Sequence, residues 1–176
     1  MRKLLFAVVP LLSLAIAAGA AADTPRMGRA VIRSAEKLFE ARLRPIWPDT
    51  PGALIGGVRG VYLDGYGAVF TAEMNTVSEN TSLIISALTP AAKENIHRTK
   101  VQRMPQLKSS LEQSLTDVGL TLDTIPMDEQ IVLQVVLDRY EWEAPGGYPA
   151  ELLFQTTRRK LMSKSADAIS VRSTER

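Results

Sequence analysis

The chain has 176 residues, one histidine and no cysteine, with 21 Lys and Arg residues against 19 Asp and Glu residues. The lack of cysteine excludes disulfides, thiolate chemistry and cysteine-ligated metal sites. A single histidine excludes metal sites that need several imidazole ligands. The length suits one domain with one hydrophobic core, and the composition points to no resident cofactor or metal.

Residues 1–22 show the three parts of a secretory signal peptide. Arg2 and Lys3 form a positive start, residues 4–18 are almost entirely apolar, and Ala20 and Ala22 offer small-residue cleavage sites. The apolar run is shorter than the roughly 20 residues of a membrane-spanning helix. We therefore expect a bacterial exported protein, periplasmic or secreted, which meets the membrane only if the signal peptide stays uncleaved.

The small excess of positive charge lies in that predicted signal peptide. Arg2 and Lys3 would be removed with it, so the remaining 154 residues (176 minus 22) carry 19 basic and 19 acidic side chains. A neutral chain without a block of like charges offers little attraction to a phosphate backbone. We expect no nucleic-acid partner.

Residues 23–52 predict an N-terminal helix followed by a proline-containing connector. Apolar residues recur at helical spacing over 26–44, and Pro45 ends the pattern because the residue before a proline is driven out of the helical region. The connector carries Trp47, which we expect to pack onto the domain.

A β-hairpin is the clearest element of the chain. Strand-forming residues at 57–63 and 68–74 flank Asp64-Gly65-Tyr66-Gly67. An Asp-Gly pair between two such segments is a strong turn signal, because glycine accepts a positive φ.

A second helix begins at Thr89, the expected N-cap, with Pro90 at the first helical position. Residues 106–118 carry a stripe of leucines, whereas residues 89–104 show few apolar positions, and Pro105 should kink or break the helix between them. The first half is basic around His97. We interpret it as a solvated face, with an anion-binding patch as the alternative.

The last third of the chain predicts strands. Residues 131–137 are nearly all apolar, as in a central strand buried on both faces, and an alternating pattern continues to Glu143. Residues 151–157 return as the partner strand. The remaining predicted elements are a helical turn over 158–164, a short strand over 168–172 and a frayed tail over 173–176.

This order predicts an α+β fold: an antiparallel sheet of about five strands with two main helices packed on it. The sheet and the second helix form a single core over residues 53–172, against which the helix at 26–44 packs. The hairpin over residues 57–72, with the sequence GVRGVYLDGYGAVFTA, resembles the first hairpin of roadblock domains. The element order is likewise roadblock/profilin-like.

Roadblock domains are dimerising scaffolds of the cytoplasm, often found beside small GTPases. The predicted export signal and the long, proline-containing second helix depart from that family, so the resemblance implies architecture and none of the partners. Over its whole length the chain is also similar to exported proteins of Gram-negative soil bacteria that have no assigned activity. That likeness implies export and nothing about chemistry.

No motif predicts a catalytic residue. The glycines near 57 and 65 lead into strands, whereas a phosphate loop leads into a helix. No serine stands in a Gly-x-Ser-x-Gly or Ser-x-x-Lys context. Asp64 suits a turn for conformational reasons, and Glu73 should lie at the far end of the hairpin, so the two carboxylates would not meet.

Four aromatic residues, Tyr140, Trp142, Tyr148 and Phe154, gather around the last predicted hairpin. Grouped aromatics mark interaction surfaces when they are exposed, and cap one end of the core when they are not. We rank them first as an interaction surface.

The sequence therefore predicts a non-catalytic interaction or scaffold domain. Its contact would be a protein partner or a second copy, joined through a sheet edge or the aromatic group. The alternative is a small periplasmic hydrolase or ligand-binding protein that uses carboxylates such as Glu73 and Asp128.

Overall fold

A computed structural model describes residues 27–49, 53–77, 88–143, 146–165 and 167–175 of the chain. The predicted signal peptide lies outside these residues. The described elements are, in order, α1 (Arg29–Leu43), β1 (Leu54–Leu63), β2 (Gly67–Met74), α2 (Pro90–Thr121), β3 (Gln130–Leu137), β4 (Glu151–Thr157), α3 (Arg158–Met162) and β5 (Ser170–Thr174). The α+β class, the hairpin and the helical turn after β4 are confirmed.

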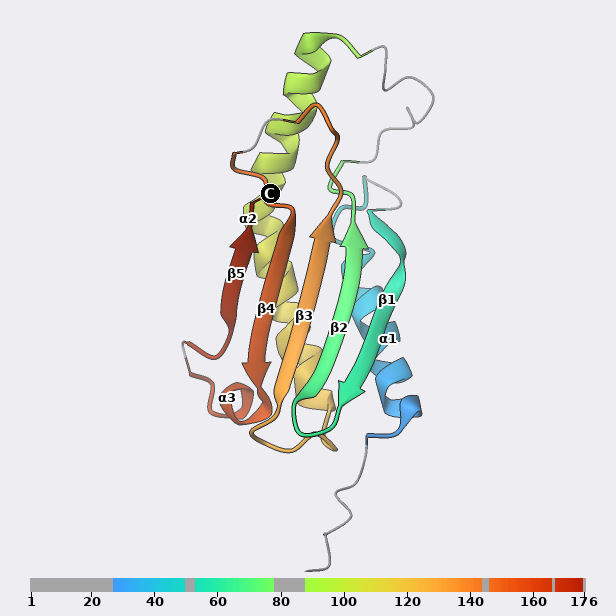
Figure 1. The fold of residues 1–176 in the computed structure, drawn as a ribbon, viewed down its shortest axis with the longest axis vertical. Helices are drawn as coiled ribbons and strands as arrows, with labels where there is room; N and C mark the ends of the chain where they lie inside the picture. The colour runs from blue at the N-terminus through green and yellow to red at the C-terminus, as the bar shows by residue number, and fades with distance from the viewer. Residues whose placement is uncertain (1–26, 50–52, 78–87, 144–145, 166, 176) are drawn as a thin grey trace, which may run out of the picture.

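The five strands form one sheet in the order β1-β2-β3-β4-β5 (Figure 1). All neighbouring pairs are antiparallel except β2 and β3, which run parallel with Gly67 opposite Gln130. The prediction of a wholly antiparallel sheet is therefore wrong, and the sheet is mixed. Helix α2 carries the chain back along the sheet between β2 and β3, and a crossover of this kind is what a parallel pair requires.

Helices α1 and α2 lie on one side of the sheet, and the opposite side is open in the described part of the chain (Figure 1). One cluster of buried apolar side chains joins the helices to the strands. Phe39 of α1 packs on Phe70 of β2, with ring centroids 4.9 Å apart. Trp47 of the connector is buried as predicted, and its Nε1 donates to Gln106 Oε1 of α2 at 3.1 Å.

Helix α2 passes through Pro105 as one helix of 32 residues, so of the predicted kink or break, the break does not occur. Pro105 is exposed, and the carbonyl four residues earlier, which loses its donor, lies on the same face of the helix. The predicted N-cap is confirmed, because the Thr89 hydroxyl accepts from the Ala92 amide at 3.2 Å. The helix ends at Thr121, three residues beyond the stripe predicted over 106–118.

Two strands end elsewhere than predicted. Strand β3 stops at Leu137 instead of continuing to Glu143, and Val136 is 43% exposed because the described chain has no layer over that face. Strand β5 reaches Thr174, so Ser173 and Thr174 pair with β4 and are not frayed.

The two edges of the sheet differ. At the β1 edge, the Val58 amide donates to Glu40 Oε1 at 3.0 Å and the Gly60 amide donates to Glu36 Oε1 at 2.7 Å, so two carboxylates of α1 occupy the place of a neighbouring strand. A Cβ on Gly57 would lie 2.5 Å from Glu40 Oε1. At the other edge, all residues of β5 are exposed.

Replacing Glu36 with alanine tests the closure of the β1 edge. The variant Glu36→Ala leaves the partly buried Gly60 amide without its acceptor, and we expect a loss of about 1–3 kcal/mol in the free energy of unfolding. Urea denaturation measures this loss. The control is Glu112→Ala at an exposed position of α2, where we expect a change within about 0.5 kcal/mol. Equal effects of the two substitutions would contradict the account.

Candidate functional site around Lys100

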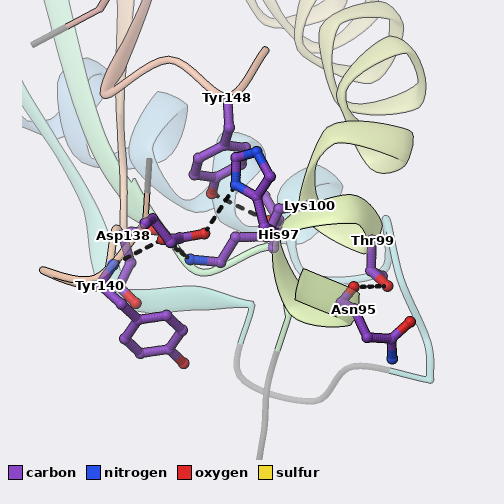
Figure 2. Close-up of polar contacts among 9 residues, drawn as sticks. Asn95, His97, Thr99, Lys100, Asp138, Tyr140 and Tyr148 are labelled. Atoms are coloured by element: carbon purple, nitrogen blue, oxygen red, sulfur yellow. Dashed lines mark hydrogen bonds and ion pairs between the residues drawn. The ribbon is translucent and has the colours of Figure 1, made fainter. Parts of the chain in front are cut away.

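Lys100 of α2 is completely buried, in a half of the helix that the sequence predicted to be solvated. Its Nζ donates to Glu143 Oε2 at 2.8 Å and to the Asp138 carbonyl oxygen at 2.9 Å (Figure 2). The same Nζ lies 4.3 Å from the ring centroid of Tyr140 and 5.0 Å from that of Tyr148. The segment that follows β3 thus folds over α2 and encloses the ammonium.

Glu143 is the counter-ion, and its side chain is 1% exposed. Its Oε2 also accepts from the Tyr140 amide at 2.8 Å. Its Oε1 has no hydrogen-bond partner in the described structure. His97 Nδ1 lies 3.7 Å from this oxygen, too far for a hydrogen bond, and that nitrogen also has no hydrogen-bond partner.

Trp142 forms the wall beside these two residues. Its ring stacks on Tyr140, with centroids 5.2 Å apart and an interplanar angle of 13°, and Lys93 Nζ lies 5.5 Å from the indole centroid. The indole Nε1 is buried without a hydrogen-bond partner. A cavity of about 310 Å³, called here the Trp142 cavity, is lined by Pro90, Lys93, Glu94, His97, Trp142 and Glu143.

The structure brings together three of the four aromatic residues that the sequence indicated. Tyr140 and Tyr148 lie against Lys100 and Trp142 stacks on Tyr140, whereas Phe154 lies on β4 and is fully buried in the core. Tyr148 is also buried, at 1% exposure. The predicted interaction surface is therefore reduced to Tyr140 and Trp142, and Tyr148 instead caps one end of the core.

Tyr148 takes part through its hydroxyl as well as its ring. The hydroxyl accepts from Thr76 Oγ1 at 3.1 Å, and burial raises the pKa of the Tyr148 phenol well above its ordinary value. The phenol therefore stays neutral beside the ammonium of Lys100, and the contact is one between a cation and an aromatic ring.

The carboxylates considered for the hydrolase alternative do not meet. Asp128 precedes β3 and pairs with Arg159, whose hydrogen bond lowers the pKa of the Asp128 carboxyl. Glu73 is exposed and lies opposite Val136, near the other end of β3. At 3.3 Å per residue, the six steps along the strand from Gln130 to Val136 separate the two carboxylates by roughly 20 Å.

The sequence held a signal for the buried lysine. Buried residues of α2 follow one stripe, and Lys100 occupies its position between Ile96 and Met104. Helical periodicity therefore placed Lys100 on the inner face, while its charge suggested the outer one. Glu143 gave no comparable signal, because it lies in a polar segment after the strand.

No family model, curated protein or solved structure matches this chain. The roles of these residues therefore rest on their geometry. Within the part of the chain that the structure describes, no helix is long and apolar enough to cross a membrane. Nor do three or more His, Asp or Glu side chains in that part gather to hold a metal ion.

The variant Glu143→Gln tests the buried pair. It leaves the Lys100 ammonium enclosed without a counter-ion, and we expect a loss of about 3–5 kcal/mol in the free energy of unfolding. The double variant Lys100→Met/Glu143→Gln removes both charges and should regain much of that loss. Urea denaturation of the purified proteins measures both values.

The control for this comparison is Asp117→Asn, which breaks the exposed pair of Arg42 and Asp117 at 2.6 Å. An exposed pair of this kind contributes about 0–1 kcal/mol. A loss for Glu143→Gln as small as that of the control would show that the buried pair does not hold the segment after β3 to α2.

Proposed function

We propose that this chain is an exported, non-catalytic interaction domain that self-associates through the free edge of β5. The observation that carries the proposal is the difference between the two sheet edges. Two amides of β1, those of Val58 and Gly60, donate to carboxylates of α1, whereas β5 pairs only with β4 in the described structure. An exposed edge strand is a template for pairing with another chain.

The composition of β5 suits pairing. Its five residues, Ser170–Thr174, include neither proline nor lysine, the residues with which soluble proteins commonly protect a free edge. Val171, the second residue of the strand, is 37% exposed and gives it an apolar position. Arg172 is its single charged side chain.

A second copy of the chain fits this edge in one antiparallel register. With the twofold axis at Val171, the two valines face each other and each Arg172 faces Ser170 of the other copy. With the axis at Arg172, the two arginines would face each other, which is destabilising. The favoured register joins the two sheets into one continuous sheet.

The ligand-binding alternative is supported by a different observation, the Trp142 cavity beside the Lys100–Glu143 pair. It does not compete with association through β5, because its residues come from α2 and from the segment that follows β3. The hydrolase form of that alternative lacks a comparable observation, since Glu73 and Asp128 lie at opposite ends of the sheet.

Sedimentation equilibrium of the purified protein tests the proposal. We expect a dimer whose dissociation constant rises at least tenfold in Val171→Lys, because a lysine on the twofold axis of the proposed register places two ammonium groups opposite each other. The matched control is Val61→Lys, at a 49% exposed position of β1, which should dimerise like the unaltered protein. A protein that is monomeric at all concentrations, or equal weakening by both variants, would refute association through β5.

A further inference from the structure

The Lys100–Glu143 pair holds a nucleophile against an electrophile in a site closed to water. The two side chains are 0% and 1% exposed, and Lys100 Nζ lies 2.8 Å from Glu143 Oε2. The rings of Tyr140 and Tyr148 lie against the amine, with centroids at 4.3 and 5.0 Å. The carboxyl carbon is one bond beyond Oε2, close to the separation of about 3–3.5 Å from which two oriented groups react. The pair is therefore positioned for condensation of the amine with the carboxyl group.

The two oxygens of Glu143 have different surroundings, as a reacting carboxyl group requires. Oε2 accepts from the Tyr140 amide at 2.8 Å, so a backbone N–H already lies where negative charge develops when an amine attacks the carboxyl carbon. Oε1 has no hydrogen-bond partner, and His97 Nδ1 lies 3.7 Å from it. Histidine is the commonest general acid, and such contacts shorten during the reaction. Oε2 is thus placed to be retained and Oε1 to leave.

An amide would satisfy groups that the ion pair leaves unsatisfied. Condensation removes both charges from the interior, where charges are costly. It also removes Oε1, a buried oxygen without a partner in the described structure. The one N–H of the amide keeps the Asp138 carbonyl as its acceptor, 2.9 Å from Lys100 Nζ, and the amide oxygen keeps the Tyr140 amide as its donor. Every polar atom of the product then has a partner.

We propose that Lys100 and Glu143 condense into an isopeptide bond, which joins α2 covalently to the segment after β3. The chain has no cysteine, so it has no disulfides, the covalent links that exported proteins commonly use. The isopeptide bond joins residues 43 positions apart, and a cross-link of this kind stabilises a fold mainly by restricting the unfolded chain. This property goes beyond association through β5 and does not depend on it.

The reaction needs no other reagent and releases one water. One proton of the Lys100 ammonium passes to the Glu143 carboxylate, and the resulting amine attacks Cδ, so that the Nζ–Cδ bond forms and the π electron pair moves onto Oε2. That pair then returns to the carbonyl, and the Cδ–Oε1 bond breaks with its electrons on Oε1. Oε1 leaves as water with the transferred proton and one from His97 Nδ1. The imidazole recovers the second ammonium proton, and the third stays on the amide nitrogen.

Mass spectrometry of the purified protein tests the proposal. We expect an intact mass below the sum of its residues by one water. Because trypsin does not cut after an acylated lysine, digestion should give residues 99–103 joined to residues 140–158 as one branched peptide. Fragmentation of this peptide should place the link between Lys100 and Glu143. A protein of full mass that is cut after Lys100 would overturn the proposal.

Two lysine variants identify the nucleophile. Lys100→Arg keeps the positive charge without the amine, and we expect it to have the full mass. The matched control is Lys160→Arg, at an exposed position of α3, which should keep the deficit of one water. A deficit that persists in Lys100→Arg would place the dehydration elsewhere and overturn the proposal. The branched peptide of the unaltered protein decides the matter even if Lys100→Arg fails to fold.

The variant His97→Phe tests the proton donor. Without the imidazole, the linked fraction in samples taken at equal early times after synthesis should fall about tenfold or more, because general acid catalysis typically contributes at least that much. Circular dichroism checks that the variant is folded. An unchanged linked fraction in folded His97→Phe would refute the role of His97.

Discussion

Two backbone amides of β1 donate to Glu36 and Glu40 of α1. These hydrogen bonds determine which edge of the sheet can pair with another chain. A sheet of five strands has two edges, and each is a row of polar backbone groups that must find partners. Helix α1 supplies them at one edge, with hydrogen bonds of 3.0 and 2.7 Å. Gly57 permits this approach, because a side chain there would meet the Glu40 carboxylate. The edge strand β5 then remains as the place where the described sheet can be extended.

The Lys100–Glu143 pair holds the segment after β3 to the N-terminal half of α2. Burying two charges is costly unless each is paired and hydrogen-bonded. Here the ammonium has two oxygen acceptors and two aromatic rings around it, while the carboxylate has one satisfied oxygen and one unpartnered oxygen. The satisfied half fixes the segment after β3 against the helix. The other oxygen of the carboxylate, Oε1, is buried without a hydrogen-bond partner in the described structure.

Elements with a local signal were predictable from the sequence, and those that depend on distant parts of the chain were not. The Asp-Gly turn predicted the hairpin, and Thr89 with Pro90 predicted the start of α2. The parallel pairing of β2 and β3 depends on where α2 returns the chain, which no local pattern encodes. Lys100 was misplaced because its charge outweighed its position in the buried stripe. The aromatic group was recognised, but its centre, a buried ion pair, joins residues 43 positions apart.

Hydrogen exchange of the backbone amides, followed by NMR at increasing protein concentration, tests the central claim most directly: one edge of the sheet is closed within the chain, and the other is closed by a second copy. The account predicts that the Val58 and Gly60 amides are protected at every concentration, because their acceptors lie in α1. It predicts that the β5 amides facing away from β4 exchange rapidly in dilute solution and become protected as the concentration rises. Unprotected β5 amides at all concentrations, or protection that instead grows along β1, would contradict it.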